Sequence, residues 1–356
     1  MGGMKDLMSN MRSPLRKIGF ITLVIAALFA LLTNLDEEHS PAVFAGETAR
    51  AVSMTPEEET LAPGYGAHAF SFAITADTRY FAGPGQYDSP QYFRGAVEAV
   101  DKAGPTAFMV SPGDLDPPSG ILWTITNTLG MTYTWYPVAG NHDLPGGGQE
   151  LEPGANLAWL NAYDYGSVNP GPSGCPTTTY SVDYENAHLI MLNEYCDASG
   201  EIATDGDIPD HLYDWLVTDL AGTDKEHIFV FGHEPGFPQP DTDSGRTRHV
   251  GDSLDQYPVN RDRFWALLAS HRVVAYICGH THNFSVTQVS GVWQIDAGHA
   301  RGLGDTGAPS TVVLIRIADD RVWYEAYRDD ANGGRYARTH SRLLRAPARQ
   351  YLPLIF

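Results

Sequence analysis

The sequence is poor in basic residues and in charged residues generally. Lys and Arg number 23 against 43 Asp and Glu, which leaves a formal charge of -20. Binding to nucleic acid depends on basic side chains that neutralise phosphates, so this balance argues against a nucleic-acid partner. Only 19% of the 356 residues are charged, while 43% are hydrophobic. One large domain with a sizeable core is therefore expected, with two small domains as the alternative.

The longest apolar run is shorter than the roughly 20 residues that a membrane span needs. It covers residues 18–32 and follows three basic residues. This order is typical of a secretory signal, and residues 43–45 offer a cleavage site, so we assign residues 1–45 to a signal peptide. The run lies far from that site, and an uncleaved N-terminal anchor is the alternative. Either way, we expect the body of the protein to be secreted or periplasmic, with a membrane contacted only through this segment.

Cysteine is scarce, with three residues in the chain. In an oxidising compartment, one of the three must stay unpaired. Cys175 and Cys196 flank a predicted hairpin and form the expected disulfide. Cys278 ends an apolar strand and is expected to be a buried thiol.

Beyond a linker rich in Glu, Pro and Gly at residues 46–66, short β-rich runs alternate with helical patterns. This order predicts a largely parallel sheet covered by helices, and the strand-rich segment after residue 285 predicts a second sheet packed on it. The expected fold is α/β, a sandwich of two mixed sheets flanked by helices. We place this domain at residues 67–330. Residues 331–356 are rich in Arg, and we expect them to form a basic tail that docks on the acidic body.

Residue types that bind metals follow five of the predicted strands. They are Asp77, Gly113-Asp114, Gly140-Asn141-His142-Asp143, Gly232-His233 and Gly279-His280-Thr281-His282. Open α/β sheets place their ligand sites at the C-terminal ends of strands, so we expect these side chains to meet. Glycine directly before four of the blocks suits tight turns that bring a side chain close to a shared centre. One such block would be an ordinary turn, but their ordered recurrence predicts a metal site.

The blocks resemble the signature of the calcineurin-like metallophosphoesterase superfamily, which is Asp-x-His, Gly-Asp, Gly-Asn-His-Asp/Glu, a lone His and Gly-His-x-His. The resemblance spans about residues 69–300. It implies a four-layer fold of two sheets between helices, and hydrolysis of phosphomonoesters or phosphodiesters at a two-metal centre. The implied ligands are Asp77, Asp114 and His282 for the first metal, and Asp114, Asn141, His233 and His280 for the second.

The mixture of oxygen and imidazole ligands favours two divalent or trivalent ions of Fe, Mn, Zn or Ni. Two such ions hold the phosphoryl group, generate hydroxide from a bridging water and neutralise the leaving oxygen. In the same resemblance, His142 faces the phosphate and acts as a general acid or stabilises developing charge.

The first block departs from the family pattern, because it reads Asp77-Thr78-Arg79. A guanidinium offers no lone pair to a metal, so the first metal lacks one ligand. Water could take the position, Tyr80 or Asp116 could swing in, or the protein could hold only one metal tightly. Arg79 itself could bind a phosphate oxygen through its guanidinium and act as a substrate-binding and catalytic residue. The alternative is a salt bridge to a nearby acid.

Pro117 marks a second departure. Many relatives carry an acid there that orients the histidine equivalent to His142, and the purple acid phosphatase branch carries a Tyr, so no iron-tyrosinate centre is expected. We interpret Arg246, Arg248 and His249 as solvated loop residues rather than contacts to the distal part of a substrate. His299 also follows a strand, and we interpret it as structural, with a position at the border of the site as the alternative.

Three functional hypotheses follow. The leading one is an exported metallophosphoesterase. The second is a protein that binds phosphate esters but lost turnover when Arg79 replaced the histidine. The third is an exported scaffold without metal, which would require the histidines of the blocks to diverge in space.

Overall fold

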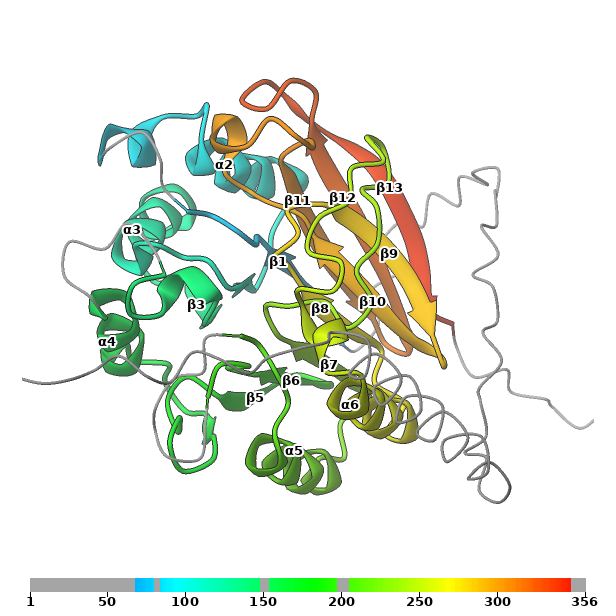
Figure 1. The fold of residues 1–356 in the computed structure, drawn as a ribbon. Coiled ribbons are helices and arrows are strands. Elements are labelled where there is room, and N and C mark those ends of the chain that lie inside the picture. Colours follow the sequence, from blue (N-terminus) through cyan, green and yellow to red (C-terminus); the bar gives the residue numbers. More distant parts are fainter. Residues whose placement is uncertain (1–67, 80–83, 148–153, 197–204, 347–356) are drawn as a thin grey trace, which may run out of the picture. The chain divides into compact units, whose positions relative to one another are not determined.

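The computed structural model describes residues 68–79, 84–147, 154–196 and 205–346 (Figure 1). The predicted signal segment and linker lie outside these residues and stay predictions. Among the described residues, no helix combines the length and the apolar character that crossing a membrane requires.

Two mixed sheets form the centre of the fold. The first has the strand order β13-β12-β11-β1-β2-β3 and the second the order β4-β5-β6-β7-β8-β10-β9. The strands of the first sheet are β1 Ala69–Ile74, β2 Phe108–Pro112, β3 Thr134–Val138, β11 Thr311–Ala318, β12 Arg321–Asp329 and β13 Tyr336–Arg345. Those of the second are β4 Asn169–Pro170, β5 Tyr180–Tyr184, β6 Ala187–Met191, β7 His227–Phe231, β8 Ala275–Cys278, β9 Phe284–Val289 and β10 Val292–Ala297.

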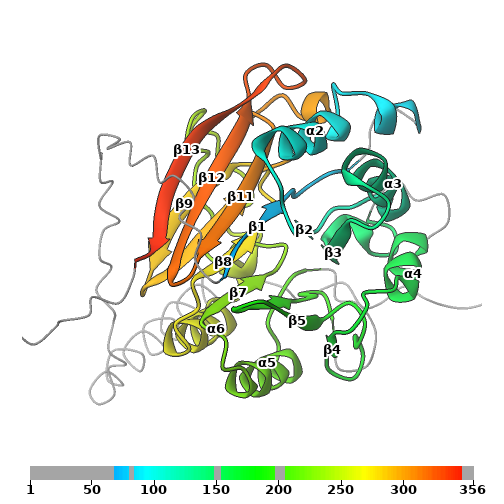
Figure 2. The ribbon, with the colours of Figure 1, turned by 180° about the vertical axis from the view of Figure 1, so that it is seen from behind.

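Helices cover the outer face of each sheet. The α-helices are α2 Phe93–Ala103, α3 Pro118–Leu129, α4 Ala155–Ala162, α5 Asp210–Gly222 and α6 Pro258–Ser270. Single 3-10 turns are η1 Pro84–Asp88, η2 Asn141–Asp143, η3 Leu254–Gln256 and η4 Gly302–Gly304. Figures 1 and 2 show α2 and α3 against the sheet that contains β1, and α5 and α6 against the sheet that contains β7. The expected sandwich of two sheets between helices is confirmed.

The layers follow from the alternation of side chains along each strand. In β1, Phe72 joins the core between the sheets, while Ala73 joins the core under α2 and α3. In β7, Phe229 joins the core between the sheets, while Val230 packs with α5 and α6. Because both faces of these strands are buried, their sequences read as continuous apolar runs, as parallel strands usually do.

The C-terminal boundary differs from the one expected at residue 330. Residue 330 falls in the turn between β12 and β13, and β13 pairs antiparallel with β12 at the edge of the first sheet. Thus the first part of the Arg-rich segment is a strand, and its arginines contact the body. Arg338 lies 3.0 Å from Glu325, and the Arg342 guanidinium stacks on the Trp293 ring. The exposed Arg338 and Arg342 on this edge strand also discourage pairing with other chains.

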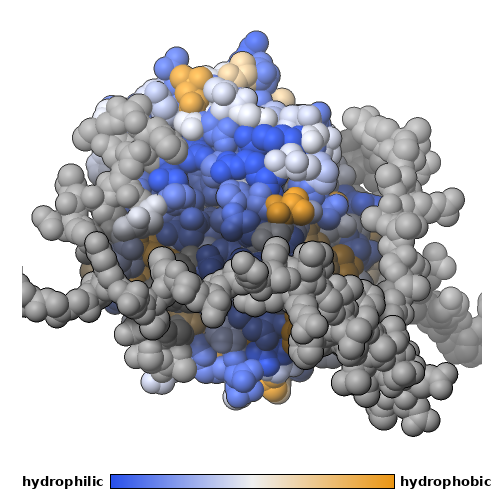
Figure 3. All heavy atoms as spheres, viewed as in Figure 1, coloured by the Kyte–Doolittle hydropathy of each residue, from blue (hydrophilic) through white to orange (hydrophobic). Residues whose placement is uncertain are grey.

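The described part of the face viewed in Figure 1 is mainly hydrophilic, with isolated hydrophobic residues (Figure 3). The segment between β7 and α6 crosses this face. It is a long loop that is joined to the sandwich through Asp241, which pairs with Arg328 of β12 at 2.6 Å. This segment supplies several residues of the candidate site.

Candidate metal centre

The residues that follow β1, β2, β3, β7 and β8 converge at one end of the sandwich. The backbone N–H of His280 donates to Asp77 Oδ2 at 2.8 Å, which joins the first block to the fifth. The backbone N–H of His142 donates to Asp114 Oδ1 at 3.0 Å, which joins the second block to the third. His233, from the fourth block, lies 3.4 Å from the same Asp114 oxygen. The side chains that the sequence analysis proposed as ligands therefore lie together.

Four of these residues have backbone conformations in the left-handed region. The φ angles are 49° at Asp77, 57° at Asp114, 68° at His280 and 58° at His282. Such angles are uncommon for residues other than glycine and cost of order 1–3 kcal/mol each, so they persist only where the surroundings hold them. Their concentration at one point of the fold supports the choice of this place as the candidate site.

Close approach of the chains explains the glycines that precede the ligands. A Cβ atom at Gly113, where φ is 81°, would overlap the His233 ring. A Cβ atom at Gly140 would overlap the backbone nitrogen of Asp114. Both positions therefore need glycine because the blocks pack directly against each other, which no single block reveals.

Four side chains form the more complete ligand set, which we call the second-metal set: Asp114, Asn141, His233 and His280. From His233 Nε2, the distances are 3.1 Å to Asn141 Oδ1, 3.3 Å to His280 Nδ1 and 3.4 Å to Asp114 Oδ1. Every one of these four atoms can donate a lone pair to a cation.

The distal nitrogen of each histidine in this set is held by a backbone carbonyl. His233 Nδ1 lies 2.8 Å from the carbonyl oxygen of Pro112, and His280 Nε2 lies 3.1 Å from that of Asp252. A carbonyl can only accept, so both distal nitrogens carry the proton of a neutral ring. The lone pairs of His233 Nε2 and His280 Nδ1 then face each other, and a cation between them removes the conflict. The donor set therefore fits a transition metal.

The electric field at His233 favours positive charge. Burial lowers the pKa of this imidazole, but Asp114 and Asp77 outweigh it and raise the pKa to about 9. Burial and the charge of His233 together hold the pKa of His280 well below its usual value. The pair can therefore carry one added positive charge, as a proton or as a metal ion.

Asp77, Asp114 and His282 form the adjoining first-metal set. They are buried, and one ligand atom from each lies within 4.8 Å of the others. Asp77 Oδ1 lies 3.3 Å from His282 Nε2. Burial raises the pKa of the Asp77 carboxyl, but His282, His233 and Arg301 outweigh it and lower the pKa well below its usual range.

His282 is surrounded by charged groups from distant parts of the chain. Its Nδ1 lies 2.6 Å from Asp305 Oδ2, an arrangement that fixes the ring as carboxylate partners of metal-binding histidines do. Arg301 Nη2 lies 2.8 Å from His282 Nε2, and Arg248 Nη1 also contacts the ring. Although burial lowers the pKa of the Arg301 guanidinium to about 10, the group stays charged at neutral pH.

Arg79 lies beside the site. The side chain is partly buried, and its positive charge contributes to lowering the pKa of both His142 and Arg301. Of the residues that the sequence analysis offered as substitute ligands, Asp116 binds Asn156 Nδ2 at 2.8 Å, so this oxygen is engaged elsewhere. Tyr80 lies outside the described residues.

His142 is the most exposed histidine of the five blocks. Its Nε2 lies 3.9 Å from Asp114 Oδ2, and its Nδ1 contacts the carbonyl oxygen of Gly147. Burial lowers the pKa of His142, while Asp114 raises it and Arg79 lowers it. The ring therefore lies at the edge of the carboxylate cluster, where a substrate could reach it.

Two buried acids support the centre, and the sequence analysis assigned no role to either. Asp143 accepts from the backbone N–H groups of Leu115 and Gly140, both at 2.9 Å, and burial beside Asp114 raises its pKa to about 8. Glu194 accepts from the backbone N–H of His233 at 2.8 Å, and burial raises its pKa to about 7. Asp143 belongs to a quoted block, but Glu194 has no local signal.

The interpretation of Arg246, Arg248 and His249 as solvated loop residues is wrong. Arg246 lies 3.0 Å from Asp305 and donates to the carbonyl oxygen of His282 at 3.0 Å. The His249 ring packs on the His280 ring at 4.1 Å between centroids. These residues come from the loop between β7 and α6 and form one wall of the site.

His299 is completely buried, and its Nε2 lies 2.9 Å from the carbonyl oxygen of Ala308. Its ring packs edge-on against His282, with 6.0 Å between centroids. The structural interpretation of His299 agrees with this position, and the residue also borders the site.

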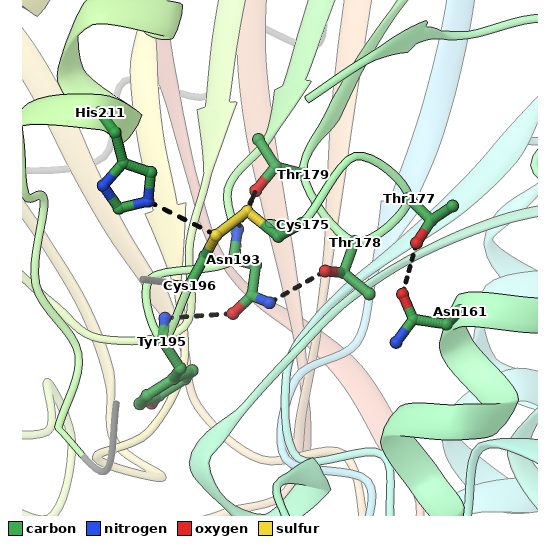
Figure 4. The surroundings of a disulfide bond; sticks show 9 residues. All are labelled: Asn161, Cys175, Thr177, Thr178, Thr179, Asn193, Tyr195, Cys196 and His211. Atoms are coloured by element: carbon green, nitrogen blue, oxygen red, sulfur yellow. Dashed lines mark hydrogen bonds between the residues drawn. A yellow bond between two sulfur atoms is a disulfide. The ribbon is translucent and has the colours of Figure 1, made fainter. Parts of the chain in front are cut away.

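A disulfide joins Cys175 to Cys196, as expected, and Cys278 is buried and unpaired. The bond links the segment before β5 to the segment after β6, and Figure 4 shows Thr179 and His211 beside it. Disulfides persist mainly in oxidising compartments, so this bond indicates a location outside the cytoplasm.

Comparisons with known proteins agree with this geometry. Residues 70–284 match the family model described as "Calcineurin-like phosphoesterase". The chain is 25% identical over 213 residues to mouse tartrate-resistant acid phosphatase type 5, covering 56% of this chain and 58% of the relative. It is 25% identical over 165 residues to purple acid phosphatase 22 of Arabidopsis thaliana, covering 45% and 33%. The chain thus spans less than two thirds of the length of these relatives.

Solved structures show the same fold. A dimetal phosphatase from Danio rerio superposes with a TM-score of 0.50 at 16% identity, covering 76% of this chain and 98% of that one. Purple acid phosphatase PPD1 from yellow lupin superposes with a TM-score of 0.52 at 12% identity, covering 77% and 53%. Because the family model covers more than half of the chain, the protein belongs to the calcineurin-like phosphoesterase family.

Proposed function

We propose that this protein is an exported, metal-dependent phosphoesterase that hydrolyses phosphomonoesters or phosphodiesters. One observation carries the proposal. His233 Nε2 and His280 Nδ1 face each other at 3.3 Å while their distal nitrogens are held by carbonyls, so the two lone pairs point at a common place for a cation. Asp114 and Asn141 complete the set, and Asp77 with His282 borders a second position.

A metal bound there supplies a Lewis acid for a phosphoryl oxygen and lowers the pKa of a coordinated water. The protein groups around it then bind and orient the ester. Arg79 lies at the edge of the site, where a guanidinium can take two phosphoryl oxygens in its planar fork. His142, whose Nε2 lies 3.9 Å from Asp114 Oδ2, would hold the leaving oxygen or give it a proton through Nε2.

Export is the second part of the proposal. The disulfide between Cys175 and Cys196 and the similarity to acid phosphatases support a secreted or periplasmic protein. A membrane would be contacted only through the N-terminal segment, if that segment stays uncleaved.

Hydrolysis of p-nitrophenyl phosphate and bis-p-nitrophenyl phosphate tests the activity. We expect turnover by protein loaded with Zn²⁺, Mn²⁺ or Fe, and loss of turnover after chelation. Asp114→Asn and His280→Ala should each reduce kcat at least about 100-fold, because each removes a ligand. His271→Ala, just after α6, is the matched control and should keep full activity. Wild-type turnover in either ligand variant would contradict the assignment.

The second candidate is a protein that binds phosphate esters without turnover. The presence of Arg79 at the position of a family ligand favours it. If metal-loaded protein binds inorganic phosphate but hydrolyses neither ester, nor a panel of nucleotides, this second candidate replaces the first.

A further inference from the structure

We infer that the protein holds a single metal ion, in the second-metal set, and that the guanidinium groups of Arg301 and Arg79 take the place of the first metal. The inference rests on the proposed function and concerns how its site is charged. It differs from the two-metal arrangement that the family resemblance implies.

Two guanidinium groups contact the His282 ring where the first metal would bind. His282 Nδ1 lies 2.6 Å from Asp305 Oδ2, and Arg248 Nη1 and Arg301 Nη2 also contact this nitrogen. His282 Nε2 lies 3.3 Å from Asp77 Oδ1 and would be the metal ligand. Arg301 Nη2 lies 2.8 Å from that same Nε2. A metal at this position would have to displace a buried guanidinium.

The positive charge of Arg301 also disfavours a metal ion beside His282. A metal about 2.1 Å from His282 Nε2 would lie no more than about 5 Å from the Arg301 nitrogen. Arg301 is only 3% exposed, so water screens the repulsion between the guanidinium and a divalent ion poorly. Arg301 Nη2 lies 3.6 Å from Asp305 Oδ2, so a carboxylate already neutralises this guanidinium without a metal.

Arg79 removes a ligand and adds a second positive charge. The family pattern has a histidine here, whereas a guanidinium cannot coordinate a metal. Arg79 follows the candidate ligand Asp77 by two residues in the segment after β1. Arg248, which contacts the His282 ring, increases this positive charge further.

The second-metal set shows none of these features. The other three ligand atoms lie 3.1 to 3.4 Å from His233 Nε2, and carbonyl oxygens hold the distal nitrogens of both histidines. A transition metal there keeps a full set of ligands. Arg301 and Arg79 then neutralise phosphoryl oxygens, as arginines do in phosphate sites, without activating water.

Metal stoichiometry tests the inference. Full-length wild-type protein is incubated with excess Zn²⁺ and, separately, Mn²⁺, then desalted and analysed by inductively coupled plasma mass spectrometry. We expect one ion per chain, and an anomalous diffraction peak between His233 and His280. The double variant Arg79→His/Arg301→Met should bind a second ion, giving two per chain and a second peak beside His282. Arg338→Met, an exposed arginine of β13, is the control and should stay at one.

Two tightly bound ions per wild-type chain, with a peak beside His282, would overturn the inference. If the double variant does not fold, wild-type stoichiometry and the position of its peak still decide. Ester hydrolysis is scored separately. A protein with two metals that hydrolyses esters refutes only the single-metal inference, whereas a protein with one metal that hydrolyses none refutes only the proposed function.

Discussion

Replacing Arg328 with Met should destabilise the protein strongly, because this residue forms a buried ion pair with Asp241. Arg328 lies on β12 and is 3% exposed. Its Nη2 lies 2.6 Å from Asp241 Oδ2, and its Nε donates to Thr311 Oγ1 at 3.1 Å. Asp241 Oδ2 also accepts from the backbone N–H of Phe284, in β9, at 2.9 Å. The pair therefore joins the loop between β7 and α6 to both sheets.

The expected loss follows from what remains after the change. Removing one partner of a buried pair costs about 3–5 kcal/mol, since the other charge stays buried without its counter-charge. Asp241 keeps the backbone N–H groups of Phe284, Asp243 and Ser244, at 2.8 to 3.1 Å. These donors reduce the penalty, so we expect a loss of about 3 kcal/mol in the free energy of unfolding.

Urea unfolding of purified protein, followed by tryptophan fluorescence, measures this loss. The control is Arg338→Met on the neighbouring strand, where the arginine pairs with Glu325 at 3.0 Å but is 48% exposed. A surface pair contributes at most about 1 kcal/mol. Replacing Asp241 with Leu in the Arg328→Met background should recover part of the stability, because no buried charge is then left unpaired. If Arg328→Met costs no more than Arg338→Met, the ion pair does not hold the loop.

Three further outcomes are expected. His142→Ala should slow hydrolysis of phenyl phosphate more than that of p-nitrophenyl phosphate, since only the poorer leaving group needs a proton; an equal effect on both would exclude the general-acid role. Replacing Cys175 and Cys196 together with Ser should cost about 3 kcal/mol in urea unfolding, because the bond closes a loop across 21 residues. For His188, burial lowers the pKa but hydrogen bonds, chiefly to Asp219 at 2.9 Å, outweigh it and raise the pKa. The stability that protonated His188 contributes is complete below about pH 6.5 and is lost as pH rises through the raised pKa. His188→Gln should therefore lower Tm more at about pH 5.5 than at about pH 9. An equal loss of Tm at both pH values would contradict the assignment.

The order of the strands and helices along the chain could be predicted, because it follows from local patterns of apolar residues. Buried parallel strands read as apolar runs, and β1, β2, β7 and β8 are such runs. The edge strand β13 was not predicted, because its arginines and exposed side chains make the segment as polar as a tail. Only pairing with β12 makes that segment a strand.

The candidate ligands and their surroundings differ in the same way. Sequence alone proposed Asp77, Asp114, Asn141, His233 and the pair His280 and His282 as candidate ligands, because each follows a strand in a short block and parallel strands end at a common edge. It also marked Arg79 as a departure, since one position of a known block carries a residue that cannot bind a metal.

Tertiary structure decided how these residues are held and charged. Arg301, Asp305 and Glu194 come from segments with no recognisable block, and they reach the site only because loops from both sheets meet there. A hydrogen bond depends on a few tenths of an ångström between residues that are far apart in the chain, and sequence spacing carries no such information. Sequence therefore determined which side chains can bind a metal, while folding determined that the buried guanidinium of Arg301 contacts one of them, His282.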